Sequence, residues 1–141
     1  MIAIGTALSG LQASMMRLNA SASNVANIES TGPVPPVSPA QPIPPRQQPN
    51  QPSVYQAIRA QQSDVKGGGT IATYKPVSPS YRLRPDPTSP HANAQGLVAA
   101  PNVDLAGELT EQLSAQLAFK ANLKVIETAN RLHDSMFERW A

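Results

Sequence analysis

Residues that could carry out chemistry are few and scattered in this sequence. The chain of 141 residues has no cysteine, which removes disulfides, thiolate nucleophiles and zinc–thiolate sites. His91 lies among turn-forming residues and His133 on a predicted helix, and neither has a His or Glu at a metal-binding spacing. Lys66 precedes glycines 67–69, whereas a phosphate-binding loop has its lysine after them, so a flexible turn is predicted. We therefore predict no catalytic residue, no metal site, no cofactor and no small-molecule substrate.

Charge and hydropathy exclude two further classes of partner. The net charge is only +2, and the cations of the middle segment are dispersed among prolines instead of forming a basic patch. Such a pattern is unlike that of nucleic-acid-binding proteins. No stretch approaches the roughly 20 apolar residues of a membrane span, and polar residues interrupt the N-terminal apolar run before it could serve as a cleaved secretory signal. We predict neither nucleic-acid binding nor direct membrane insertion.

The elements of the chain are divided by its prolines, all of which lie between Pro33 and Pro101. Residues 1–32 and 102–141 are proline-free and have helical periodicity, so we predict a helix over 2–28 and another that begins at Asn102 or Asp104. The predicted fold is mainly α. The N- and C-terminal helices of one chain pair as a coiled coil, and residues 33–101 form a Pro-rich irregular insert with a small β component.

Each predicted helix carries an apolar row with alternating steps of three and four residues, which is typical of a helix packed against another helix. The N-terminal row consists of Ile4, Leu8, Leu11, Met15, Leu18, Ala22 and Val25. The C-terminal row consists of Leu105, Leu109, Phe119, Leu123, Ile126, Phe137 and Trp140, with Gln112, Gln116, Asn130 and His133 as polar members. We predict that these two rows are the packing surfaces of the helices. Further apolar surface needs neighbouring molecules, so we expect oligomerisation.

The middle segment gives weaker signals. Residues 33–52 contain overlapping P-x-x-P spacings, which favour an extended spacer or loop without helix or central strand. Residues 70–74 and 81–83 alternate like short strands, and 97–99 are expected to be extended. An alternative function follows from the proline tract: a soluble coiled-coil adaptor that docks a proline-binding domain, with Arg46 as the flanking cation.

Two stretches resemble a known family. Residues 21–32, with Asn24, Val25, Ala26 and Asn27 followed by Thr31 and Gly32, are similar to the signature that closes the N-terminal helix of bacterial flagellar rod and hook proteins. Residues 90–104, together with Glu108 and 121–129, resemble the C-terminal half of the proximal rod family FlgC. Both stretches occur in the expected order along the chain.

The resemblance implies a structural subunit of the proximal rod of the flagellar basal body, which transmits torque across the periplasm. Its expected partners are other rod subunits and basal-body ring proteins, with self-assembly into a helical array. It further implies export through the flagellar secretion channel without a cleaved signal peptide. Asn24 and Asn27, one turn apart near the helix end, are expected to be satisfied by nearby backbone or side-chain groups, and ordinary C-terminal capping is an equally good interpretation.

Overall fold

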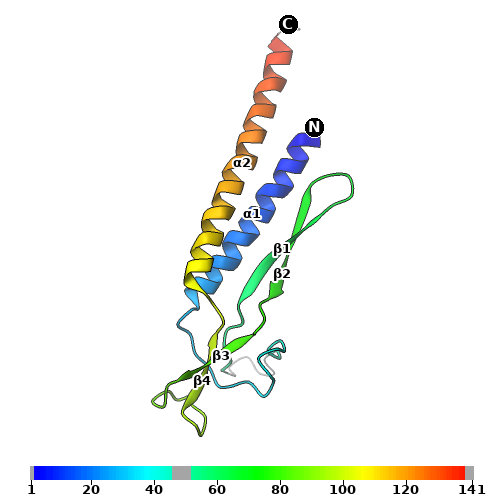
Figure 1. The fold of residues 1–141 in the computed structure, drawn as a ribbon. Coiled ribbons are helices and arrows are strands. Elements are labelled where there is room, and N and C mark those ends of the chain that lie inside the picture. The colour runs from blue at the N-terminus through cyan, green and yellow to red at the C-terminus, as the bar shows by residue number, and fades with distance from the viewer. Residues whose placement is uncertain (1, 46–51, 139–141) are drawn as a thin grey trace.

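The computed structural model describes residues 2–45 and 52–138. It contains helix α1 (Ile2–Ala26), strands β1 (Ile58–Asp64), β2 (Thr70–Pro76), β3 (Tyr81–Pro85) and β4 (Leu97–Pro101), and helix α2 (Leu105–Glu138). The helices run in opposite directions side by side, and the β1–β2 ribbon lies along α1 on the side away from α2 (Figure 1). The prediction of two terminal helices around a small β insert is confirmed.

Local chemistry explains where the helices begin and end. The Asp104 side chain accepts a hydrogen bond at 3.1 Å from the backbone N–H of Gly107, so Asp104 is the N-cap of α2. At the other helix, the Asn27 side chain donates to the Ser23 carbonyl at 2.8 Å, where the helical ladder stops. Asn27 therefore has the capping role that was one of its two predicted interpretations.

The β insert consists of two separate antiparallel ribbons. In the first, β1 pairs with β2 from Ile58 opposite Pro76 to Asp64 opposite Thr70. In the second, β3 pairs with β4, and Gly32 adds an isolated bridge to Ala99. The predicted strands at 70–74, 81–83 and 97–99 lie within β2, β3 and β4. Strand β1 was not predicted, because its sequence is largely polar and only one of its faces is covered.

The proline tract is tied to the second ribbon over its described part, residues 33–45. The Tyr81 hydroxyl donates to the Val37 carbonyl at 2.7 Å, and the backbone N–H of Ser80 donates to the Pro39 carbonyl at 2.7 Å. Val34 and Ile43 pack against a small core formed by Val54, Tyr81 and Ala99. These residues form neither helix nor strand, as predicted, but they are packed and are not a free spacer. Arg46 and Trp140 lie outside the described residues.

Candidate assembly interface

The two helices meet along rows of small and polar residues. On α1 the row is Gly10, Ser14, Arg17, Ser21 and Asn24, and on α2 it is Glu108, Glu111, Ala115, Ala118 and Asn122. Both rows advance by alternating steps of three and four residues, the spacing of helices that pack nearly parallel to each other's axis. We call these residues the contact row. Ser14, Ser21, Asn24 and Ala115 are almost completely buried in it.

Close approach of the helices depends on Gly10. A Cβ atom at this position would come within 2.7 Å of the Asn122 side-chain amide. Further along the row, the Ser21 hydroxyl donates to the Glu108 carbonyl at 3.0 Å. The small side chains therefore let the two backbones approach, and the hydroxyls and amides within the row find hydrogen-bond partners.

Asn24 joins three elements of the fold. Its side-chain amide donates to the Ile58 carbonyl and to the Glu108 carboxylate, each at 2.8 Å, and its oxygen accepts from the Ile58 backbone N–H at 3.0 Å. The Tyr55 hydroxyl lies 3.0 Å from the same oxygen. Asn24 thus pairs with the edge of β1 as a neighbouring strand would, while it also holds α2. We call this arrangement the Asn24 joint.

An ion pair between Arg17 and Glu111 crosses the contact row, two turns from the joint along α1 and one turn along α2. The Arg17 guanidinium contacts the Glu111 carboxylate with two hydrogen bonds, at 2.5 and 2.9 Å, and donates a third to the Ser114 hydroxyl at 3.2 Å. The hydrogen bond from Arg17 lowers the pKa of Glu111 below its ordinary value, and the same bond raises the pKa of Arg17. Both groups therefore keep their charge near neutral pH.

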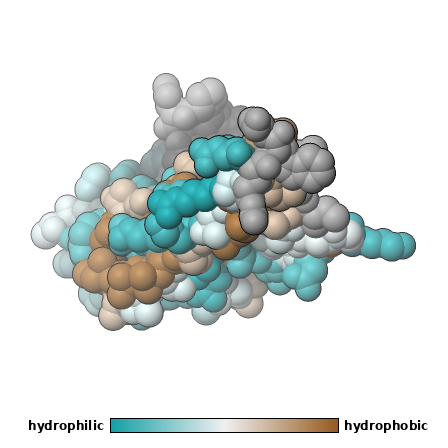
Figure 2. Space-filling view, turned by 90° about the horizontal axis from the view of Figure 1, so that it is seen from above, coloured by the Kyte–Doolittle hydropathy of each residue, from teal (hydrophilic) through white to brown (hydrophobic). Residues whose placement is uncertain are grey.

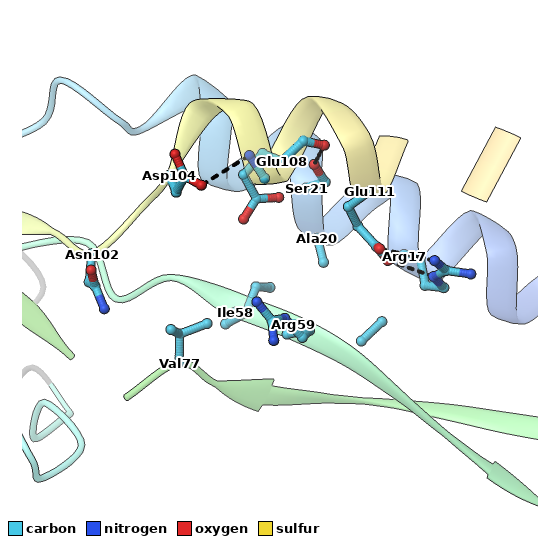
Figure 3. Close-up of a pocket in the computed structure, with 12 residues that line it drawn as sticks. Arg17, Ala20, Ser21, Ile58, Arg59, Val77, Asn102, Asp104, Glu108 and Glu111 are labelled. Carbon is cyan, nitrogen blue, oxygen red and sulfur yellow. Dashed lines mark hydrogen bonds and ion pairs between the residues drawn. The ribbon is translucent and has the colours of Figure 1, made fainter. Parts of the chain in front are cut away.

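A polar groove of about 480 Å³ lies between the helix pair and the β1–β2 ribbon (Figure 3). It is lined by Arg17, Ala20, Ser21, Ile58, Arg59, Ala60, Val77, Asn102, Asp104, Gly107, Glu108 and Glu111. Several of these residues are already hydrogen-bonded to one another: the Asp104 carboxylate accepts from the Gly107 backbone, Ser21 donates to the Glu108 backbone and Arg17 to the Glu111 side chain (Figure 3). Within 2–45 and 52–138, no cluster of three metal-ligating side chains occurs, and no helix is long and apolar enough for a membrane span. The groove lies where α1, α2 and the ribbon meet, and hydrogen bonds from Ser21 and Asn24 connect these elements.

The predicted apolar rows lie one residue C-terminal to the contact row on both helices. On α1, Leu11, Met15 and Ala22 of the predicted row each directly follow a residue of the contact row. On α2 the same holds for Leu109, Phe119 and Leu123. One residue turns a helix by about 100°, and in an antiparallel pair the same forward shift rotates both helices toward the same side. The predicted residues therefore flank the contact between the helices instead of filling it. We call the apolar members of these rows, among them Leu8, Met15, Leu109 and Leu123, the apolar face; Gln112, Gln116, Asn130 and His133 are the polar members of the α2 row.

Burial of the predicted residues follows from this rotation. Leu11 and Asn24 are buried, and Leu18, Val25, Asn27, Phe119 and Ile126 are half-buried, whereas Leu8, Leu105, Leu109, Leu123 and Phe137 are exposed. As a seam between α1 and α2 the prediction is wrong for these five exposed residues. The small side chains of the contact row face the partner helix in their place, and Phe137 lies beyond the part of α2 that α1 reaches. Their role in assembly remains a prediction. Seen from above, hydrophobic side chains gather in a surface patch on one side of the molecule (Figure 2).

Sequence reasoning missed most of the contact row. The signal was present, since glycine, serine and asparagine at positions 10, 14, 21 and 24 repeat with the same steps as the apolar row. Such a pattern of small residues is typical of helices in close contact. The predicted row differs only in having larger side chains.

Comparison with known proteins agrees with this architecture. The model of the family described as flagellar basal body rod FlgEFG protein C-terminal matches residues 94–138, which include all of α2. The flagellar basal-body rod protein FlgC of Yersinia enterocolitica is 38% identical over 127 residues, covering 88% of this chain and 85% of that protein. FlgC of Salmonella typhimurium is 34% identical over the same coverage, and FlgC of Aquifex aeolicus is 27% identical over 138 residues, with 98% and 95% covered.

A match over 88% of the chain includes both ribbons and at least part of each helix, so the similarity is not confined to one motif. It includes the helix-closing signature that holds Asn24, and the start of α2 that holds Glu108, the two ends of the Asn24 joint. The chain belongs to the FlgC family of flagellar basal-body rod proteins.

Proposed function

We propose that this protein is a structural subunit of the proximal rod of the flagellar basal body, where it forms part of a helical tube that transmits torque across the periplasm. The observation that carries the proposal is the division of apolar surface. The helix pair is closed by small and polar side chains, while large apolar side chains such as Leu8, Leu109 and Leu123 stay exposed. A protein that functions alone rarely leaves such a face uncovered.

The helix pair suits a load-bearing role for a physical reason. Contact rows with steps of three and four residues are the geometry of a coiled coil, and we infer that α1 and α2 form one in the assembled rod. The Asn24 joint fixes the ribbon to this pair through hydrogen bonds to both. Torque applied to the ribbon side is thereby passed to the helices without a flexible hinge at the joint.

We further propose that the partners are other rod subunits and the ring proteins of the basal body, and that residues 1–32 and 102–141 act as one assembly unit. The residues proposed for packing between subunits are those of the exposed and half-buried apolar face. In the described part of the proline tract, Val34 and Ile43 pack on the second ribbon, an arrangement that does not favour the free docking segment of the adaptor alternative.

Deletion of the gene tests the proposal. The deletion strain is expected to lack rods, hooks and swimming, and expression of the intact chain from a plasmid should restore all three. A variant with the exposed prolines Pro36, Pro44 and Pro45 changed to alanine separates the two functions, since a docking adaptor would lose its partner while a rod subunit would still enter basal bodies. Hooks and normal swimming in the deletion strain would refute the rod assignment.

A further inference from the structure

Strand β1 has an edge that its partner strand β2 does not cover. At the two ends of the ribbon, the backbone N–H of Val77 donates to the Ala57 carbonyl at 2.8 Å, and that of Val65 donates to the Gly69 carbonyl at 3.2 Å. Because hydrogen-bonded and non-bonded pairs alternate in an antiparallel ribbon, the even-numbered residues of β1 direct their N–H and C=O groups away from β2. We call these residues the outer edge of β1: Ile58, Ala60, Gln62 and Asp64.

The first residue of the outer edge is paired as if another strand lay beside it. The Asn24 side chain bonds to both the N–H and the C=O of Ile58, at 3.0 and 2.8 Å. A side-chain amide offers an acceptor and a donor, the same pair of groups that a residue of a neighbouring strand presents. Asn24 therefore takes one residue's place in a third strand and leaves the next place open.

The next residue of the outer edge, Ala60, lies about 7 Å farther along the strand and lines the polar groove. Within the two described ranges, no residue bonds to its outward N–H or C=O group. Ala60 is only 9% exposed, so little of it reaches open solvent. Buried backbone groups nearly always have hydrogen-bond partners in native proteins. The groove thus contains a backbone donor and acceptor that a further strand would satisfy.

The groove has the size and the walls to admit an extended segment. Its volume of about 480 Å³ is in the range of pockets that enclose ligands. Figure 3 shows Ile58 and Arg59 on one side of it and Ser21 on the other. The helix side includes Ala20, Ser21 and Gly107, whose small size leaves room for a peptide backbone beside the outer edge.

Charge in the groove favours a basic segment over an acidic one. The lining includes two arginines and three carboxylates. Arg17 and Glu111 pair with each other, which leaves Arg59 against Asp104 and Glu108. A segment with one lysine or arginine balances this remainder, whereas an acidic segment adds to the excess of negative charge.

The occupant must come from outside the described part of this chain. The extended segments within 2–45 and 52–138 are already paired in the two ribbons, and Val34 and Ile43 of the proline tract are packed on the second one. A segment that adds to a strand edge must have its own backbone groups free.

We propose that the outer edge of β1 binds an extended segment of a different basal-body protein, which enters the groove as a third strand beside Ala60 and places a lysine or arginine near Asp104 and Glu108. This inference rests on the proposed function, because neighbours in the basal body supply the segment. Backbone hydrogen bonds provide the affinity, and the small helix wall and the carboxylates select the sequence.

Hydrogen exchange of single amides tests the contact on the unmodified chain. The protection of the Ala60 amide relative to the Gln62 amide, each corrected for its intrinsic rate, should rise at least about tenfold from the isolated chain to purified basal bodies. Gln62 is the matched control, because it belongs to the same outer edge and does not line the groove. An unchanged ratio would overturn the proposal.

Photo-cross-linking identifies the occupant, because the chain has no cysteine of its own and accepts a label at a single introduced one. A benzophenone attached to Arg59→Cys in purified basal bodies should join to a segment with lysine or arginine from a different protein. Gln61→Cys, exposed on the same strand and outside the groove, should give little of this product. A product with a second copy of this chain, equal products from both variants, or none would overturn the proposal. The rod assignment fails separately, if the unmodified chain is absent from basal bodies.

Discussion

Two rows of residues run along the helix pair one residue apart, and their side chains differ in size and polarity. The contact row uses glycine, serine, alanine, asparagine and one ion pair, while the adjacent apolar face uses leucine, methionine, phenylalanine and isoleucine. The difference indicates which contacts form within a chain and which are left for its neighbours. Small residues and hydrogen bonds fix the geometry of the pair, and the larger hydrophobic gain stays available for association.

The apolar face has a magnitude that suits reversible assembly. Leu8, Met15, Leu109 and Leu123 are each about half exposed. Covering the remaining half of such a side chain contributes about 1 kcal/mol, so these four residues supply roughly 4 kcal/mol to a contact. A single contact of this size is weak, and many repeated contacts in an array are strong.

The roles of the two rows can be distinguished by introducing a charged residue into the apolar face. Leu123→Glu is expected to abolish incorporation into basal bodies and swimming, because a charge buried between subunits costs several kcal/mol. Its effect on the isolated chain should be within about 0.5 kcal/mol, since the side chain is already exposed there. Quantification of the protein in purified basal bodies, with circular dichroism of the isolated variant, measures both effects.

Lys124→Glu is the matched control for this charge, because Lys124 is exposed and forms only a surface ion pair with Glu127. It should be incorporated normally. Ile126→Glu gives the intermediate case, since this half-buried residue should lower both incorporation and the stability of the isolated chain. Equal loss at Leu123 and Lys124 would place the interface on another side of α2.

Loss of the Asn24 joint should have the largest effect on the stability of the single chain. Asn24→Leu removes hydrogen-bond partners from the backbone of Ile58 and from Glu108, so the free energy of unfolding should fall by about 3 kcal/mol. Hydrogen exchange of the Ile58 amide provides a local measurement, and its protection should disappear. Asn27→Ala, which loses one local bond, should cost only about 1 kcal/mol. Similar losses in both variants would mean that the joint does not hold the ribbon.

The sequence predicts the helices better than their contact, and the reason lies in particular residues. Pro33 and the Asp104 cap bound the helices through short-range chemistry that a sequence shows directly. The rotation of α1 against α2 is not short-range. Rows that contain Gly10 and Leu11 have the same spacing, and only the close approach at Asn122 decides between them.

The ribbon shows the same limit. Strand β1 was missed because it has a largely polar sequence, and what holds it is the amide of Asn24, thirty-four residues away from Ile58. A hydrogen bond to a distant side chain leaves no periodic pattern in the strand that receives it. The candidate site was therefore predictable as a pair of helical surfaces, while the joint that connects them to the ribbon was not.

The close approach of the helices can be tested at two glycines of α1. Gly10→Ala places a methyl group against the Asn122 amide and should destabilise the chain by about 1 kcal/mol, the cost of overpacking exceeding the gain in helix propensity. Gly5→Ala, where nothing lies within 4 Å, should instead stabilise it by about 0.5–1 kcal/mol. Urea unfolding measures both, and adding Asn122→Ala to Gly10→Ala should restore part of the loss. A stabilised Gly10→Ala variant would contradict tight packing at this point.

The smallest expected effect is the pH dependence of the ion pair in the contact row. Because the pKa of Glu111 is lowered in the folded chain, chiefly by its hydrogen bond from Arg17, its contribution is present above the ordinary glutamate pKa and is lost as pH falls through the folded value. The pair is partly exposed, so the contribution should be no more than about 0.5 kcal/mol. The free energy of unfolding of Glu111→Gln should lie below that of the unmodified chain at pH 6, and the two should converge toward pH 3. Glu127→Gln, on the exposed surface of α2, is the control. A constant difference between Glu111→Gln and the unmodified chain from pH 6 to pH 3 would show that Glu111 acts through packing or hydrogen bonding and not through its charge.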